Sequence, residues 1–247
     1  MDYWLIVLLF LVIAFVYASV GFGGGSSYLA VLALYHFPFQ EMRLTALICN
    51  VIVVTGGVIL YFKNKQINWR KILPLTLISV PMAYLGATLK ISEETFFTIL
   101  GITLIVAAVL LWIKSDYKIP SDTNAEEKSA VVKNALLGGG IGFLSGLVGI
   151  GGGIFLSPLL NLMNWDTARK IAAASSVFIL VNSISGIVGQ VSKLPSHIDF
   201  SRIGILCLAV LVGGQIGSRM SLKWNLLIIK RMTAILVLIA GINVLIK

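Results

Sequence analysis

The chain has 247 residues, of which 58% are hydrophobic and only 12% are charged, and its mean hydropathy is +0.98. Soluble domains carry about 25% charged residues, so this composition excludes a water-soluble fold. The net charge of +9 comes from basic residues spread through short loops, which argues against a nucleic-acid partner and for orientation in a membrane. We therefore predict an all-α polytopic membrane protein whose surroundings are the lipid bilayer.

The apolar segments form two sets. Runs close to the length that crosses a bilayer as a helix, about 20 residues, alternate with shorter apolar runs. The first set is expected at 3–20, 26–37, 44–62, 72–89 and 95–113. Residues 114–134 hold lysines, acids and small polar residues, which is typical of a solvated linker. The second set is expected at 135–148, 154–163, 171–191, 203–220 and 229–246.

The two sets match in sequence, which indicates an internal repeat. Gly21-Phe22-Gly23-Gly24-Gly25 reappears as Gly149-Ile150-Gly151-Gly152-Gly153, residues 67–70 resemble 198–201, and Gly86 corresponds to Gly217. Matches in the same order, at nearly the same offset, predict duplication of one half. We expect a first membrane repeat at 1–113 and a second at 135–247, each with four to five membrane helices that include a short or glycine-broken one.

The distribution of basic residues bears on the orientation of the halves. If each half crosses the membrane an odd number of times, most of the 19 lysines and arginines share one side. If the short segments are re-entrant and the first segments cross, the halves are parallel and the charges divide more evenly. The positive-inside rule therefore favours inverted-topology repeats in a prokaryotic cytoplasmic membrane, with both termini outside the cytoplasm.

The glycine motifs are the first candidate site. Non-helical backbone inside a membrane must line a cavity or be buried in protein. In inverted-repeat transporters such breaks leave half-helix N-termini near the midplane, where N–H groups and the positive dipole end hold an anion without a buried cation. The substrate-binding candidates here are Gly23, Gly24, Gly25, Ser26, Ser27, Gly151, Gly152, Gly153 and Ser157. The competing interpretation is a tight turn or close helix packing, the role that we assign to Gly138, Gly142, Gly146, Gly213 and Gly217.

Polar residues inside the apolar segments supply further candidates. Polar groups at membrane depth usually face the interior of a bundle, so we add Asn50, Ser175, Ser176 and Asn182 to the substrate-binding set. The amides of Asn50 and Asn182 have the most hydrogen-bonding groups to satisfy. Serine hydroxyls also bond to carbonyls of their own helix, so both interpretations stay open for them.

No acidic residue is expected deep inside an apolar segment. Glu41, Asp166 and Asp199 are expected in loops, which leaves no intramembrane carboxylate as a proton relay. Arg43, Arg169 and Lys170 follow the short segments, where they set topology, contact headgroups or attract anions to an entrance. No cofactor or metal is expected, because Cys49 and Cys207 lack the spacing of a disulfide framework or zinc site and no nucleotide motif occurs.

These motifs resemble the sulfite exporter TauE/SafE family of membrane permeases. The resemblance rests on the paired Gly-x-Gly-Gly-Gly motifs, the second within residues 146–158, and on residues 172–176 leading into Asn182. It covers essentially the whole chain. It implies a permease, not an enzyme, whose partner is a small anionic sulfur-containing substrate such as sulfite, thiosulfate or an organosulfonate.

Two alternatives stay open beside a permease that works by alternating access. One is a passive anion channel, or a transport subunit that needs an energising partner. The other is an intramembrane hydrolase with Ser145 or Ser26 as nucleophile, which requires a base within hydrogen-bond reach. The candidate bases, His36 and His197, are expected near membrane boundaries, which disfavours the hydrolase. The oligomeric state is left open.

Overall fold

The computed structural model describes residues 3–113, 127–191, 198–221 and 226–246, and the regular structure in these ranges is entirely helical. The ten helices are α1 (Tyr3–Ala18), α2 (Gly25–Leu34), α3 (Phe39–Lys63), α4 (Trp69–Thr88), α5 (Glu93–Trp112), α6 (Glu127–Val148), α7 (Gly153–Leu162), α8 (Ala168–Gln190), α9 (Phe200–Ser221) and α10 (Leu226–Ile246). Among the described residues, α3, α4, α5, α8 and α9 are long and apolar enough to span a membrane. The predicted all-α polytopic class is confirmed.

Two helices begin well before the expected segments, α3 at residue 39 instead of 44 and α6 at residue 127 instead of 135. α6 begins at Glu127, inside the range expected as linker, while residues 114–126 lie outside the described part. α3 begins at Phe39 and so contains Glu41, which was expected in a loop. Glu41 lies in the first turn of α3 and is buried, where the positive end of the helix dipole favours a carboxylate. Hydropathy misses this turn because it is polar, although it is packed inside the protein.

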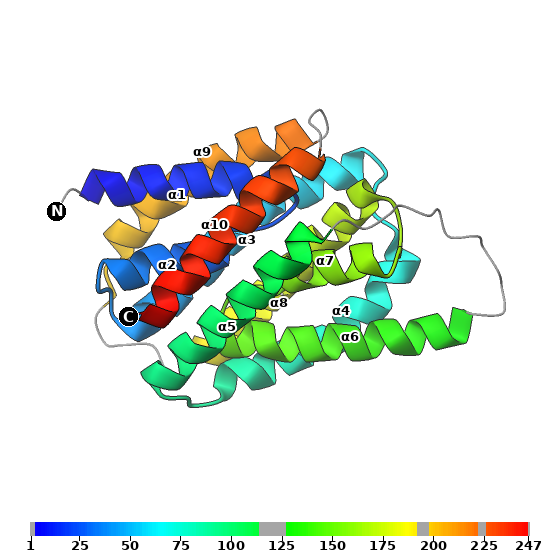
Figure 1. The fold of residues 1–247 in the computed structure, drawn as a ribbon, viewed down its shortest axis with the longest axis horizontal. Helices are drawn as coiled ribbons and strands as arrows, with labels where there is room; N and C mark the ends of the chain where they lie inside the picture. Colours follow the sequence, from blue (N-terminus) through cyan, green and yellow to red (C-terminus); the bar gives the residue numbers. More distant parts are fainter. Residues whose placement is uncertain (1–2, 114–126, 192–197, 222–225, 247) are drawn as a thin grey trace.

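The two halves pack with reciprocal contacts. α1 packs on α9 and α6 packs on α4, while α3 packs on α8 and α5 packs on α10. If α1 is exchanged for α6, α9 for α4, α3 for α8 and α5 for α10, the same set of contacts results. In Figure 1, α1 runs away from the end where the N-terminus lies and α6 runs toward that end. The equivalent first helices of the two halves therefore point in opposite directions.

Glycines allow the close contacts between the halves. A Cβ at Gly146 of α6 would collide with the Ala83 carbonyl oxygen of α4, and Gly138 and Gly142 approach the same helix backbone equally closely. A Cβ at Gly217 of α9 would collide with the Phe15 carbonyl oxygen of α1, and Gly213 meets Leu11 in the same way. Small residues let membrane helices approach at their backbones, so the predicted packing role of these glycines is confirmed.

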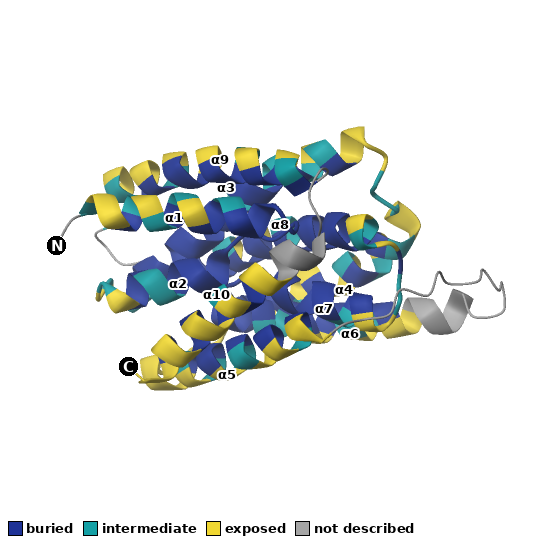
Figure 2. Ribbon diagram, turned by 45° about the horizontal axis from the view of Figure 1, so that its top comes forward, coloured by how far each residue is buried: buried dark blue, intermediate teal, exposed yellow. Residues whose placement is uncertain are grey.

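Burial places α3 and α8 at the centre of the bundle. They are the most buried of the five long helices that the structure describes. Figure 2 shows dark, buried ribbon in the middle of the molecule and exposed residues along the outer faces of α1, α9, α5 and α10. Large exposed apolar side chains such as Leu8, Ile102 and Leu208 lie on these outer faces, as a lipid-facing surface requires.

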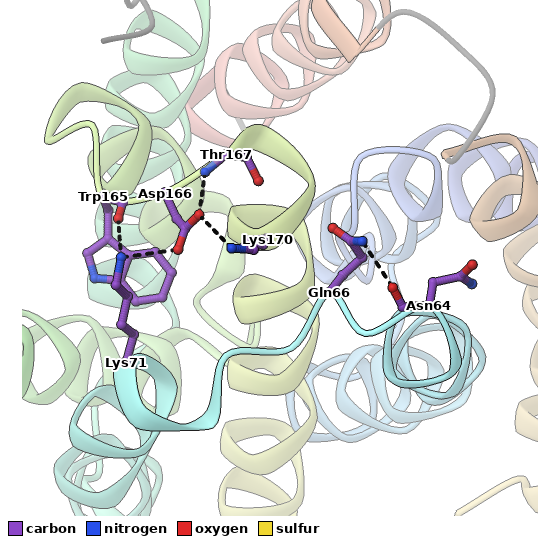
Figure 3. A network of polar contacts seen from close by, with 7 residues as sticks. All are labelled: Asn64, Gln66, Lys71, Trp165, Asp166, Thr167 and Lys170. Carbon is purple, nitrogen blue, oxygen red and sulfur yellow. Dashed lines mark hydrogen bonds and ion pairs between the residues drawn. The ribbon is translucent and has the colours of Figure 1, made fainter. Parts of the chain in front are cut away.

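A polar clamp joins the halves at one end of the bundle (Figure 3). The Lys71 ammonium in the first turn of α4 lies 3.1 Å from Asp166 Oδ2, and Lys170 Nζ lies 3.4 Å from Asp166 Oδ1. Lys71 Nζ also donates to the Trp165 carbonyl at 3.1 Å. Partial burial raises the pKa of the Asp166 carboxyl, but the Thr167 N–H and Lys71 outweigh it, so this pKa lies below its ordinary value of 3.8.

Two alanine substitutions on one helix test the close packing of α4 on α6. Gly146→Ala places a methyl against the backbone of Ala83, whereas a Cβ at Gly140 meets nothing within 4 Å. We expect Gly146→Ala to lower stability by about 1 to 3 kcal/mol, as overpacking does. Gly140→Ala should leave it unchanged or raise it by about 0.5 kcal/mol. Thermal unfolding of the two purified variants measures the difference, and equal midpoints would contradict the packing.

The clamp predicts a pH dependence of stability. Because the folded-state pKa of Asp166 is depressed, its contribution is present above the unfolded-state value near pH 4 and is lost as pH falls through the folded-state pKa. We expect Asp166→Asn to cost about 0.5 to 1 kcal/mol at pH 7, since the pair is partly exposed. Unfolding midpoints of wild type and variant should converge below pH 4. A difference that does not shrink as the pH falls below 4 would show that the carboxylate charge is not its source.

Candidate functional site

The two glycine motifs meet at one amide side chain. Asn50 of α3 is completely buried. The backbone N–H of Gly25, the first residue of α2, donates to Asn50 Oδ1 at 2.8 Å, and Asn50 Nδ2 donates to the Ile150 carbonyl at 3.1 Å. Asn50 therefore joins the helix start after the first motif to the backbone of the second motif, across a sequence separation of 100 residues.

The first motif is contacted in turn by α8 of the second half. Ser176 Oγ donates to the Gly21 carbonyl at 2.9 Å as well as to the Ala172 carbonyl of its own helix. A Cβ at Gly21 would lie 2.9 Å from Ala172 Cβ. Each motif is thus contacted by the central helix of the opposite half, which places both motifs at the interface between the halves.

Glycine is required at the motifs because neighbouring groups occupy the Cβ positions. A Cβ at Gly23 or Gly25 would collide with the Asn50 amide. A Cβ at Gly151 would lie 2.8 Å from Ser183 Oγ and 3.0 Å from Asn50 Nδ2. Gly24 and Gly152 also have left-handed backbone, with φ of 93° and 78°, in the residue before α2 and before α7. Side chains at these positions would therefore be strained or would displace Asn50 and Ser183.

The starts of the two short helices differ chemically. A Cβ at Gly153, the first residue of α7, would collide with the Ile179 side chain, whereas the same position in α2 meets Asn50. The first N–H groups of a helix have no acceptor within the helix. Asn50 supplies an acceptor to α2, but an isoleucine side chain has no acceptor and Gly152 makes no side-chain cap. The Gly25 N–H of α2 thus has a side-chain acceptor, which the equivalent Gly153 N–H of α7 does not have among the described residues.

Several buried polar atoms around the motifs have no hydrogen-bond partner. They are Tyr28 Oη, Ser145 Oγ and Ser183 Oγ, while Ser175 Oγ and Asn182 Oδ1 of α8 are also buried without a partner. Tyr28 and Ser145 lie against the Cβ positions of Gly24 and Gly152, and the Ser175 carbonyl lies 3.4 Å from that of Gly153. A buried polar group without a partner costs about 1 to 3 kcal/mol, so several together at one place indicate a binding site.

Other predicted residues are engaged within the protein. Ser26 and Ser27 lie 3.3 and 2.6 Å from the Tyr17 hydroxyl. Asn161 Nδ2 donates to the carbonyl and the hydroxyl of Ser157 in α7. Asn182 Nδ2 donates to the Phe178 carbonyl of its own helix at 2.9 Å. A role of these residues in substrate binding stays a prediction.

Sequence reasoning left three of these residues out of the site. Ser145 was considered only as a nucleophile, Ser183 adjoins the predicted Asn182, and Tyr28 follows Gly24 by one helical turn. The turn-length spacing from Gly24 is the signal that could have found Tyr28, because glycine leaves room for its ring. Ser145 and Ser183 have no local signature, since they reach the second motif only through tertiary packing.

Arg43 has a different role from the one predicted at a surface entrance. It is buried, and its Nη2 donates to the carbonyls of Gly146 and Leu147 at 3.1 and 3.0 Å, at the C-terminal end of α6. A cation there complements the helix dipole. No carboxylate pairs with Arg43 among the described residues. A buried positive charge thus lies beside the second glycine motif, although the sequence indicated an anion site without one.

The described residues give no support to the hydrolase alternative. Ser26 Oγ lies beside the Tyr17 hydroxyl, and Ser145 Oγ has no hydrogen-bond partner. His36 follows the end of α2, with a φ of 57°, and His197 lies outside the described residues. Within the described part of the chain, no three His, Cys, Asp or Glu residues lie together as metal ligands.

Comparisons with known proteins agree with this architecture. The family model Sulfite exporter TauE/SafE matches residues 6–244. A probable membrane transporter protein of Sinorhizobium fredii is 32% identical over 241 residues, covering 96% of this chain and 95% of its own. Another from Bacillus subtilis is 26% identical, over 98% and 96% of the two chains. A third, from Methanocaldococcus jannaschii, is 26% identical over 77% and 74%. No solved structure matches the chain.

Replacing two asparagines tests the joining role of Asn50. Asn50→Leu leaves the Gly25 N–H and the Ile150 carbonyl buried without the partners they have here, which should cost about 2 to 4 kcal/mol. Asn182→Leu removes only a bond within α8 and should cost about 1 kcal/mol or less. Thermal unfolding in one detergent compares the two variants. Equal losses would show that Asn50 does not hold the motifs together.

Proposed function

We propose that this chain, which belongs to the sulfite exporter TauE/SafE family and is a membrane transporter, moves a small sulfur-containing oxyanion across the cytoplasmic membrane by alternating access. The substrate class is sulfite, thiosulfate or an organosulfonate. The observation that carries the proposal is the meeting of both glycine motifs at Asn50, with unpartnered hydroxyls packed against them. Such a site offers mainly donors, which suits an anion with several acceptor oxygens.

The anion binds first at the N-terminus of α7. The first N–H groups of this helix have Ile179 beside them, so a substrate oxygen does not have to displace an internal acceptor. Ser183 adds a hydroxyl donor next to Gly151, and the unpartnered hydroxyl of Ser175 belongs to the residue whose carbonyl lies near Gly153. The positive charge of Arg43, beside Gly149, favours an anion electrostatically.

The first motif completes the site. Gly23, Gly24 and Gly25, together with Asn50, place the start of α2 opposite the second motif. Asn50 Nδ2 lies 3.0 Å from the Cβ position of Gly151, so this donor can turn from the Ile150 carbonyl to a substrate oxygen. Ser176 and Asn182 add polar groups from α8. Ser26 and Ser27 can exchange their contact with the Tyr17 hydroxyl for one with the substrate, and Ser157 can do so with its contact to the Asn161 amide.

The closed state of this site supports alternating access. Asn50, Ser175 and Ser183 are fully buried, so neither face of the protein reaches them in this arrangement. The repeat pairs α1 with α9 and α4 with α6, and each pair holds one helix from each half. We propose that the halves are inverted in the membrane, with both termini outside the cytoplasm, so that equivalent movements open opposite faces. The opposite directions of α1 and α6 support this proposal (Figure 1).

Flux through proteoliposomes tests the proposal and its alternatives. We expect uptake of labelled sulfite or thiosulfate to saturate and to show counterflow, as a carrier requires. Transport that does not saturate would indicate a channel, and no transport by the pure protein would indicate a missing partner. A thermal-shift screen with sulfite, thiosulfate, sulfate, sulfoacetate, taurine and chloride selects the substrate beforehand, because a bound ligand raises the unfolding midpoint.

Serine variants assign the site within the same assay. Ser183→Ala removes a hydroxyl beside Gly151 and should weaken apparent substrate affinity by about three- to tenfold. Ser218→Ala is the matched control, because the buried Ser218 hydroxyl donates to Gly214 of its own helix at 2.8 Å. Equal affinities of the two variants would remove Ser183 from the site.

Gly152→Val should abolish transport while leaving membrane insertion intact, since its left-handed backbone excludes a β-branched residue.

A further inference from the structure

A second polar site lies away from the glycine motifs, where the loop between α3 and α4 meets the first turn of α8. It is a shallow pocket of about 380 Å³ lined by Lys65, Ile67, Asn68, Trp69, Arg70 and Lys170. Three of its six lining residues are cations and none is acidic. The loop and the α8 residue come from different halves of the chain, so the pocket forms only when the halves are assembled.

The positive charge at this pocket is poorly compensated. Neither Lys65 nor Arg70 forms an ion pair with any residue that the structure describes. Lys170 pairs with Asp166 at 3.4 Å, but the same carboxylate also pairs with Lys71 at 3.1 Å. Asp166 is thus the only carboxylate that pairs with any of Lys65, Arg70, Lys71 and Lys170 among the described residues, and the excess positive charge attracts an anion.

The start of α4 adds hydrogen-bond donors to the same pocket. α4 begins at Trp69, the preceding Asn68 makes no side-chain cap, and the first turn has no acidic residue. The first N–H groups of α4 and its positive dipole end therefore lie in the wall that also carries Arg70. A guanidinium, two ammonium groups and helix N–H groups together form a donor set suited to an oxyanion.

The position of the pocket fits the boundary between membrane and water. Trp69 is 51% exposed, and tryptophan concentrates at the headgroup level of membranes. Both lysines of the pocket can also reach this level, because lysine side chains extend from helix ends toward the interface. A ligand can therefore reach the pocket from water or from the lipid headgroup layer.

We propose that this pocket binds a phosphate-like oxyanion, held by Lys65, Arg70, Lys170 and the N-terminus of α4. Two sources share this chemistry, the phosphodiester of an anionic lipid headgroup and a free oxyanion from the water phase. The proposal is independent of the transport site, because no residue of the pocket belongs to the glycine motifs or contacts Asn50.

Tryptophan fluorescence of the delipidated full chain in a phosphate-free sugar detergent tests the proposal. One titration adds sodium sulfate or phosphate against sodium chloride at equal ionic strength, and another adds a soluble short-chain phosphatidylglycerol. We expect a saturable signal that disappears in Trp69→Phe. A response to the salts indicates a free oxyanion, and a response to the lipid alone indicates a headgroup. Absence of a saturable signal in both titrations overturns the proposal.

Matched charge variants separate a built site from general attraction to a basic loop. Lys65→Gln and Arg70→Gln should each weaken binding by at least about tenfold, the loss expected for one charge-assisted hydrogen bond. Lys63→Gln is the control, because Lys63 is exposed two residues away and does not line the pocket. It should change the affinity by less than about twofold. Equal effects of Lys63→Gln and Lys65→Gln would overturn the proposal, and Ser183→Ala should leave this binding unchanged.

Discussion

The Asn50 amide is the interaction on which the centre of this structure depends. Broken helices inside a membrane protein expose backbone donors and acceptors that no water can satisfy, so each must find a partner in the protein. Asn50 provides both kinds of partner at once, an acceptor for Gly25 and a donor for Ile150. Glycine is needed at Gly23, Gly25 and Gly151 because this side chain and Ser183 occupy the volume in which their Cβ atoms would lie. Glycine motifs and asparagine therefore form one unit.

The same amide makes the two halves unequal. Each half carries a glycine motif followed by a short helix, yet only α2 has an asparagine acceptor at its start. Ile179 lies at the equivalent place of α7, and the buried Arg43 side chain lies beside Gly149 of the second motif. The two motifs therefore have different surroundings, although Asn50 and Arg43 both come from α3.

The sequence predicts most of the framework because duplication and helix packing leave periodic signals. The matched motifs predict two halves, and glycines four residues apart, as at Gly138, Gly142 and Gly146, predict helix contacts at backbone distance. The partners in the site leave no such signal. Arg43 binds carbonyls more than 100 residues away, at the end of α6, and Asn50 has a separation of 100 from Ile150. Nothing near either residue in the sequence distinguishes these contacts from a surface position or a bond within a helix.

The proposed alternating access requires the halves to separate without a large barrier, and the polar clamp at the surface fits this requirement. Asp166 pairs with Lys71 of the first half and with Lys170 of its own half. When Lys71 moves away, Lys170 still compensates the carboxylate, so no isolated charge is left behind. The cost is then that of one partly exposed pair, about 1 kcal/mol or less. In contrast, separating Asn50 from Ile150 leaves buried polar groups unpaired, at about 1 to 3 kcal/mol each. In this scheme the acceptor oxygens of the proposed anion bond the freed Asn50 Nδ2 and offset that part of the cost at the centre, where the clamp cannot. The centre, not the clamp, is therefore the place where a bound anion can control the movement.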